Sequence, residues 1–384
     1  MMPKGKVATL TFFNRLNFGA ELQAYALQRK ISSLGYTCEI LDVLSPDDPQ
    51  ARQPVRYSAR KAAHRMHSSQ TKLNNYLYKK MERLFGYKNE RLTRRGFQKF
   101  KEQHLVVSQQ KFACVDDLYS IDLDYDTFVT GSDQVWNPQT RITSPEPYFL
   151  TFAPPASKRF SYAASFGITM LPEDMREDYR RWLANIQNIS VRENEGVAIV
   201  RDLTGRQAQV VLDPTLLITP DGWREVARPY AEGRYVVIYS RVYSKYIYDV
   251  AVRVAKSLGA RIIRIPRGHI REGLEFGVSY AFGNGPAEFL GLFQGAAFII
   301  SSSFHGTAFA VNFRKPFYTI LRKGGAVNSR MTSFLCNIGL SHRILYEQDE
   351  LRQIVPHVDF AQTDMVLSRE RAASTAFLQQ SLAG

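Results

Sequence analysis

A chain of 384 residues is long enough for two domains of ordinary size, and its apolar content of 45% excludes disorder of the whole chain. Its apolar stretches fall short of the roughly 20 residues that span a bilayer, and its first residues lack a signal-peptide core, so we expect a cytoplasmic protein. The three cysteines, Cys38, Cys114 and Cys336, lie far apart, which favours reduced thiols over a zinc site or a disulfide framework.

The chain opens with a β-α-β pattern. Residues 7–13 are rich in strand-forming side chains, and a turn-prone link at 14–19 follows them. Residues 20–33 carry apolar side chains at helical spacing before Gly35, and residues 38–43 predict a second strand. Such a unit begins a parallel sheet.

The net charge of +14 is concentrated in the segment that comes next. Residues 51–101 carry 15 Lys and Arg against Glu82 and Glu90, a local charge of +13. The segment has few strand signals, and we interpret it as one or two helices inserted into the first sheet domain. Its cations form either a solvated face or a surface that attracts an anionic partner. Lipid headgroups or an anionic sugar carrier rank above nucleic acid, because the chain shows no nucleic-acid motif elsewhere.

Strand patterns resume after the basic segment and alternate with helical patterns. Strands are expected at 126–130, 159–163, 189–192 and 210–212, with helices at 173–186 and 193–203. Breaks at Asp213-Pro214 and at 219–222 end this alternation. We therefore predict a first domain over residues 1–215.

A second alternation of strands and helices follows this boundary. Strands are expected at 235–239, 261–265, 298–301 and 317–321, with helices at 248–258, 286–294 and 307–313. We predict a second domain over residues 216–350 and a tail over 351–384 that ends in a helix at 369–382. Periodicity thus predicts two α/β domains.

Polar residues follow two strands of the first domain. Asn17, Gly19 and Glu21 lie at a strand-to-helix turn, where free N–H groups suit an anionic or hydroxyl-rich ligand, although Gly19 equally suits a tight turn. Asp133 follows the strand at 126–130 and is placed to hold or deprotonate a sugar hydroxyl, and Trp136 to stack on a sugar face. The alternative makes Asp133 a turn or N-cap residue and Trp136 part of the core.

Three further candidates lie at helix starts. Arg192 follows a strand and can bind carboxylate or phosphate, or form an ion pair with Glu193 or Glu195. His305 can hydrogen-bond a phosphate or transfer a proton, unless it is a structural histidine. Glu288 lies near the start of the preceding helix, where it can also serve the helix dipole.

Seven short motifs occur in one order along the chain. They are N-F-G-A-E-L-Q-A-Y-A-L-Q from Asn17, G-S-D-Q-V-W-N from Gly131, S-Y-A-A-S-F-G from Ser161, S-V-R-E-N from Ser190, L-D-P-T from Leu212, G-P-A-E-F from Gly285 and S-F-H-G-T-A-F-A from Ser303. With these motifs the chain resembles the polysaccharide pyruvyl transferase family over most of its length. The basic segment at 51–101 carries none of them.

The resemblance implies two Rossmann-like domains that face each other across a cleft, a glycosyltransferase-B-like architecture. It also implies transfer of a pyruvyl group from phosphoenolpyruvate to a saccharide during bacterial exopolysaccharide or capsule biosynthesis. The products would be a pyruvate ketal and inorganic phosphate. We expect no metal and no other cofactor, because the protein's own cations can balance the charge of the donor.

On this hypothesis His305 contacts phosphate or protonates C3 of the donor, and Asp133 contacts or deprotonates the acceptor. In well-known branches of the family the histidine follows Arg-Leu, whereas here Ser303 and Phe304 precede it. Downstream cations are candidates to replace the arginine that position 303 lacks. The donor side is expected to comprise Arg192, Ser303, Glu288, Arg322, Lys323 and Arg330, and the acceptor side Asn17, Gly19, Glu21 and Trp136.

The expected acceptor is a saccharide that is often carried on a polyprenyl pyrophosphate, so the basic segment is expected to hold the enzyme on the inner membrane face. Two alternatives stay open. One is a nucleotide-sugar glycosyltransferase of similar shape. The other is a non-catalytic protein on a degenerate transferase fold that associates with membranes or nucleic acid, which the missing arginine favours and the retained Asp133, Arg192 and His305 oppose.

Overall fold

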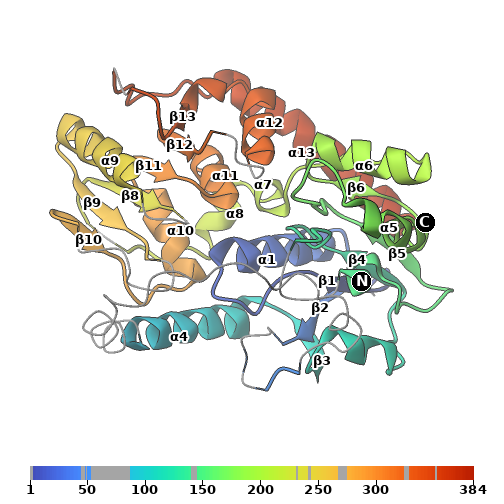
Figure 1. Ribbon diagram of the computed structural model, residues 1–384. Helices are drawn as coiled ribbons and strands as arrows, with labels where there is room; N and C mark the ends of the chain where they lie inside the picture. Colours follow the sequence, from blue (N-terminus) through green and yellow to red (C-terminus); the bar gives the residue numbers. More distant parts are fainter. Residues whose placement is uncertain are drawn as a thin grey trace, which may run out of the picture. The chain divides into compact units, whose positions relative to one another are not determined.

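The computed structural model describes residues 3–44, 48, 50–52, 87–139, 145–230, 232–240, 244–266, 275–323, 328–350 and 353–384 (Figure 1). The chain divides into two compact units, and each is described by itself. The first comprises Met1–Met66, His104–Leu217 and Leu367–Gly384, and the second His67–Gln103 and Ile218–Val366. The sequence placed the whole basic segment in the first domain. Of that segment, residues 53–86 lie outside the described residues, and 87–101 belong to the second unit.

The first unit contains a five-stranded parallel sheet in the order β3-β2-β1-β4-β5. The strands are β1 (Lys6–Leu10), β2 (Thr37–Val43), β3 (Val107–Phe112), β4 (Thr127–Thr130) and β5 (Lys158–Ser161). A short parallel pair, β6 (Ser190–Val191) and β7 (Gln209–Val210), follows β5 through a bridge between Ala164 and Val191. The helices are α1 (Phe18–Ser33), α5 (Arg176–Leu183), α6 (Asn194–Thr204) and α7 (Pro214–Leu217), with 3-10 turns at Val115–Tyr119, Glu146–Phe149 and Glu173–Met175.

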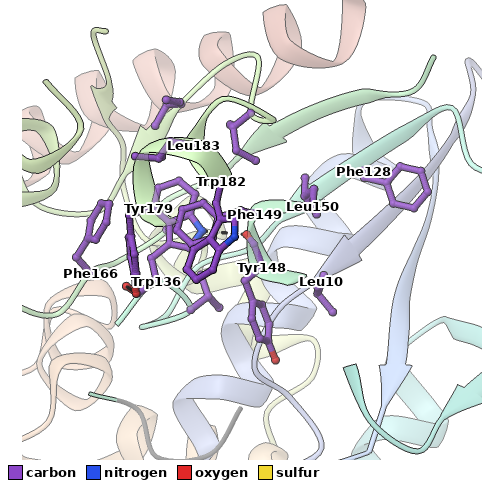
Figure 2. Packing of buried hydrophobic residues seen from close by; sticks show 14 of the residues in the cluster. Leu10, Phe128, Trp136, Tyr148, Phe149, Leu150, Phe166, Tyr179, Trp182 and Leu183 are labelled. Carbon is purple, nitrogen blue, oxygen red and sulfur yellow. Dashed lines mark hydrogen bonds between the residues drawn. The ribbon is translucent and has the colours of Figure 1, made fainter. Parts of the chain in front are cut away.

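The core of the first unit lies on both faces of this sheet. On one face an aromatic cluster gathers around Trp136 and Phe149, whose rings stack with centroids 4.7 Å apart (Figure 2). On the other face α1 and the last turns of α13 (Ala361–Ala383) pack through Leu27, Phe377 and Leu378. Burial on both faces applies to the central strands β1 and β4, in which every residue except Lys6 is buried.

The second unit contains a six-stranded parallel sheet in the order β10-β9-β8-β11-β12-β13. The strands are β8 (Tyr235–Tyr239), β9 (Arg261–Arg264), β10 (Val278–Tyr280), β11 (Phe298–Ser301), β12 (Phe317–Leu321) and β13 (Ile344–Tyr346). The helices are α4 (Tyr87–His104, of which His104 belongs to the first unit), α8 (Pro220–Arg224), α9 (Lys245–Leu258), α10 (Pro286–Gly295), α11 (Phe304–Asn312) and α12 (Ser329–Asn337), with a 3-10 turn at Ser341–Arg343.

Both sheets are doubly wound, which confirms the predicted α/β class with two Rossmann-like units. In the first unit the chain proceeds outward from β1 to β3 and then returns to pair β4 with β1. In the second unit it proceeds from β8 to β10 and returns to pair β11 with β8. Ligands of open α/β sheets bind beyond the carboxyl ends of the strands where the order reverses. The β1/β4 and β8/β11 junctions are therefore where sites are expected.

Helix α4 is fixed to the second unit by a contact between two glycines. A Cβ atom at Gly96 would lie 2.6 Å from the backbone nitrogen of Gly285, and the backbone N–H of Gly283 donates to Oδ1 of Asn89 at 2.8 Å. Phe97 and Phe100 are buried on the same side of the helix. Only glycine allows this close approach of two backbones.

Replacing Gly96 with alanine is expected to destabilise the second unit by about 1–3 kcal/mol, because the added methyl group overlaps backbone atoms that cannot move aside. The clash outweighs the gain of up to about 1 kcal/mol that alanine brings to a helix interior. Urea unfolding measures the change. Gln98→Ala, on the exposed side of α4, is the control, and equal stability of both variants would contradict the glycine contact.

In the described part of the chain, no helix combines the length and the apolar character that crossing a bilayer requires.

Candidate functional site

The candidate residues of the first unit lie beyond the carboxyl ends of β1, β4, β5 and β6. The Oγ1 atom of Thr11, which follows β1, donates to the carbonyl oxygen of Ser132 at 2.8 Å and ties the ends of β1 and β4 together. A Cβ atom at Gly131 would lie 2.7 Å from Cβ of Thr11, so this junction requires glycine. The next residue but one, Asp133, bridges to Ala164 beyond β5.

Arg192 lies in this group and is surrounded by three carboxylates. Its Nη1 atom donates to Oδ2 of Asp213 at 3.0 Å. Its Nε atom lies 3.6 Å from Oε2 of Glu193, and its Nη2 atom lies 3.9 Å from Oδ1 of Asp133. The arginine side chain is 2% exposed. We call these four residues the Arg192 cluster; one cation among three carboxylates gives it a formal charge of −2.

Neighbouring groups hold the carboxylates of the Arg192 cluster in place. Oγ of Ser132 donates to Oδ2 of Asp213 at 2.8 Å, and Oγ1 of Thr215 donates to Oδ1 of the same residue at 2.7 Å. Oγ of Ser165 donates to Oε1 of Glu193. Buried carboxylates need such donors, because an unsatisfied buried charge is strongly unfavourable.

The electrostatics of the cluster do not support the expected donor-binding role of Arg192. Burial alone would lower its pKa, but the coulombic attraction of Asp213, Glu193 and Asp133 holds the pKa above its ordinary value. The guanidinium is thus committed to protein carboxylates, and an anionic donor would meet their combined negative charge. The sequence also allowed an ion pair between Arg192 and Glu193 in place of ligand binding, and the structure shows this ion pair.

Asp133 is the most accessible carboxylate of the Arg192 cluster. Its side chain is 13% exposed, whereas those of Glu193 and Asp213 are buried. Its backbone has a φ of 75°, a left-handed conformation that few residues other than glycine adopt. Its Oδ1 atom accepts from the backbone N–H of Gln134 at 2.9 Å. Asp133 therefore is a turn residue and also keeps part of its carboxylate exposed.

Trp136 is a core residue, which corrects the expectation that it stacks on a sugar. Its side chain is fully buried, Phe149 covers one face of the ring, and Nε1 donates to the carbonyl oxygen of Tyr148 at 2.9 Å (Figure 2). Phe166 packs on it as well. A ring enclosed in this way offers no face to a saccharide.

The turn before α1 carries Asn17, Gly19 and Glu21. Oδ1 of Asn17 accepts from the backbone N–H of Gly19 at 3.2 Å, so Asn17 is the N-cap of α1. Gly19 and Glu21 are buried, and Glu21 lies in the first helical turn, where a carboxylate favours the helix dipole. Of the three, Asn17 is the residue that is still partly exposed.

The second unit builds a site at the β8/β11 junction. Ser240 and Ser302 directly follow these two strands, and their Oγ atoms lie 2.9 Å apart. Ser303 is the N-cap of α11, and His305 lies in its first turn with 7% of the residue exposed. The free N–H groups at a helix start attract anions. This end of α11 therefore has the character of an anion site.

Gly306 brings the start of α11 close to the sheet. A Cβ atom there would lie 2.2 Å from Oγ of Ser301 and 2.7 Å from Cδ1 of Tyr239. Oγ of Ser301 donates to the carbonyl oxygen of Tyr239 at 3.0 Å and accepts from the N–H of Ser303 at 3.0 Å. The G in the S-F-H-G motif is thus explained by this close packing, which fixes the position of His305.

Three cations were candidates to replace the arginine that position 303 lacks. Arg322 and Lys323 are more than half exposed and form ion pairs with Glu347 (3.0 Å) and Asp349 (3.2 Å), respectively. Arg330 differs, because it is only 6% exposed in the first turn of α12.

Arg330 lies close to the start of α11. It precedes Phe334 by four residues and so shares its helix face. The ring of Phe334 packs against Phe304, in the first turn of α11, at 5.8 Å between centroids. Of the three cations, Arg330 is therefore the one on the side of the expected anion site.

Glu288 has a structural role at the start of α10. Its Oε2 atom accepts from the backbone N–H of Gly285, the N-cap residue, at 3.0 Å, and its Oε1 atom lies 3.4 Å from Nη1 of Arg228. The helix-dipole alternative describes this position better than donor binding.

The two strand-end sites also contain residues to which the sequence patterns assign no role: Asp213, Ser132, Ser240 and Ser302. Asp213 belongs to the L-D-P-T motif, which is visible in the sequence. The sequence does not show that its partner is Arg192, which lies 21 residues earlier in the chain. The two serines of the second unit follow apolar strands, as site residues of parallel sheets do. Their position directly after an apolar strand is the feature of the sequence that could have identified them.

Solved structures share the fold of this chain. A UDP-GlcNAc 2-epimerase from Methanocaldococcus jannaschii matches with 10% identity and a TM-score of 0.52, over 94% of this chain and 91% of that chain. A Listeria monocytogenes protein assigned as a UDP-N-acetylglucosamine 2-epimerase matches with 8% identity and a TM-score of 0.51, over 97% of both chains. These matches confirm the glycosyltransferase-B-like fold class and show nothing beyond the fold.

Sequence comparison gives the family. Curated proteins yield no significant match. The family model described as polysaccharide pyruvyl transferase matches residues 17–324, which contain all seven motifs and both strand-end sites apart from Arg330. Because this match covers most of the chain, the protein belongs to the polysaccharide pyruvyl transferase family.

Proposed function

We propose that the protein transfers a pyruvyl group from phosphoenolpyruvate to a saccharide and forms a pyruvate ketal in the biosynthesis of a bacterial surface polysaccharide. Family membership supports a transferase that acts in polysaccharide modification. The observation that carries the donor assignment is the start of α11 at the β8/β11 junction, with His305 in its first turn and Arg330 on the neighbouring helix.

Phosphoenolpyruvate carries a phosphate and a carboxylate, so its site needs several positive groups. The N–H groups at the start of α11 supply partial positive charge, and Arg330 supplies a full one. Ser303 and the Ser240–Ser302 pair add hydroxyl groups at the same strand ends. We assign the donor to these residues in place of Arg192.

The reaction balances without a redox step. C3 of the donor gains a proton, and C2 then has oxocarbenium character. One sugar hydroxyl adds to C2, the C–O bond to phosphate breaks, and a second hydroxyl closes the ketal. Of the two hydroxyl protons released, one replaces the proton delivered to C3 and one leaves with phosphate. We assign delivery to C3 to His305, and acceptance of a hydroxyl proton to Asp133, with Asn17 as a further acceptor contact.

The proposed function predicts phosphate release that depends on both substrates. Purified protein is incubated with phosphoenolpyruvate and a panel of lipid-linked sugars, including polyprenyl pyrophosphate carriers. Inorganic phosphate is measured together with the mass of the sugar, which is expected to increase by the mass of a pyruvyl ketal. Phosphate release without a change in sugar mass would mean simple hydrolysis and would contradict the transfer.

A nucleotide-sugar activity is the second candidate, since the fold matches proteins named for UDP-GlcNAc. Thermal-shift titration separates the two donors. Stabilisation by phosphoenolpyruvate and none by UDP-GlcNAc is expected. The reverse result would favour the nucleotide sugar, and no stabilisation by either would favour a non-catalytic protein.

A further inference from the structure

Helix α4 presents a basic face on the side opposite to its packing face. Asn89, Phe97 and Phe100 are buried, whereas four cations are exposed: Arg91, Arg94, Arg95 and Lys99. The helix holds six Lys and Arg against two acidic residues. Its exposed face is therefore strongly positive.

Arg91, Arg95 and Lys99 form a ridge along this face, which we call the α4 ridge. Residues four apart lie on the same side of a helix, about 6 Å apart along its axis. The acidic residues of α4 are engaged elsewhere: Glu90 pairs with Arg94 at 2.6 Å, and Oε1 of Glu102 accepts from Gln98 at 2.7 Å. Among the described residues, no carboxylate forms an ion pair with the ridge.

Exposed apolar side chains flank the α4 ridge. Leu92, which is 40% exposed, lies against Gly283, where a Cβ atom would be 2.9 Å from Cβ of Leu92. The next residue back along the chain, Phe282, is 42% exposed and stacks on Tyr280 with ring centroids 5.7 Å apart. Large apolar side chains beside a row of cations are the composition of a surface that rests on a membrane.

We propose that the α4 ridge, with Leu92 and Phe282 beside it, is a docking surface for an anionic lipid membrane. The cations attract anionic headgroups, and the two apolar side chains enter the boundary between headgroups and acyl chains. The glycine contact at Gly96 holds the helix, so the cations are presented by a packed element. Leu92 offers no stacking face to a base, and Tyr280 already stacks on the ring of Phe282, so the surface favours lipid over nucleic acid.

Vesicle flotation with the full chain tests the docking surface. The protein is mixed with vesicles of phosphatidylcholine alone, or of phosphatidylcholine with phosphatidylglycerol, at low and high salt. Binding is expected only with phosphatidylglycerol, and weaker at high salt. Each cation near such a surface contributes about 1 kcal/mol, so the triple variant R91Q/R95Q/K99Q is expected to bind roughly a hundredfold more weakly.

Two further variants make the experiment decisive. R234Q/R253Q/K256Q removes three exposed cations elsewhere in the second unit and is expected to keep full binding. L92S/F282S is expected to lose the binding that survives high salt. Equal loss of binding in both triple variants would show a general charge effect and overturn the proposed docking surface. Equal binding to both vesicle types would overturn it as well. So would tighter binding to duplex DNA, measured in parallel, than to anionic vesicles. The readout requires no turnover, so it stands or falls separately from the proposed reaction.

Discussion

Replacing Arg192 with methionine is expected to lower the stability of the first unit by about 3–5 kcal/mol. The variant leaves Asp133, Glu193 and Asp213 without their shared cation, and two of these carboxylates are buried. A buried charge that loses its partner is far more costly than an exposed one. Urea unfolding in a Trp223→Phe background measures the loss, because the remaining fluorescence then comes from Trp136 and Trp182, both in the core of this unit.

A second change distinguishes the charge effect from loss of packing. Asp213→Asn in the R192M background removes one of the uncompensated carboxylates and is expected to recover part of the lost stability. Arg201→Met, at an exposed position of α6, is the matched control and is expected to change stability little. If R192M unfolds at the same urea concentration as the wild-type protein, the Arg192 cluster does not stabilise the unit. Donor binding would then again be the favoured role of Arg192.

Replacing His305 with glutamine is expected to reduce kcat for ketal formation by about 10²–10⁴-fold, the range that a positioned acid or base contributes. Glutamine keeps a polar side chain of similar size at this nearly buried position but cannot deliver a proton as imidazolium does. Phosphate release with both phosphoenolpyruvate and the acceptor sugar at saturating concentration measures kcat, and thermal unfolding checks that the fold is unchanged.

His342→Gln supplies the comparison for this experiment. His342 is exposed in the 3-10 turn Ser341–Arg343, and partial desolvation of its ring together with the positive charge of Arg343 lowers its pKa. It lies outside both strand-end sites, so its replacement is expected to leave kcat unchanged. Equal activity of both variants would refute the assignment of His305 as the acid, and equal loss in both would show that the assay reports stability.

The central elements of both units could be predicted because their strands are buried on both faces. Strands β8, β11 and β12 begin and end where the apolar runs predict. The strands that were not predicted lie at the edges of the sheets. β3 reads V-S-Q-Q-K-F with three exposed residues in its centre, so it lacks the apolar run of a central strand. The three-residue strands β10 and β13, at the two edges of the second sheet, are too short for a periodic signal.

Side-chain roles could be predicted less well than elements. The sequence placed Arg192, Asp133 and His305 at strand ends, and all three lie there. It could not show that Arg192 faces three carboxylates, because Asp133 and Asp213 are 59 and 21 residues away along the chain. Nor could it show that Trp136 is enclosed by Phe149 and Tyr148, since exposure depends on what packs against a residue.

The sequence by itself determined the class of fold and the family, because apolar periodicity and short ordered motifs are local properties of the chain. Only the tertiary structure decided which charged residues are committed to each other. Strand order brings the ends of β1, β4, β5 and β6 together and so closes Arg192 within its carboxylates, and it sets His305 at the β8/β11 junction. The energy of a charge depends on its burial and its neighbours, and in a parallel sheet those neighbours come from distant parts of the chain.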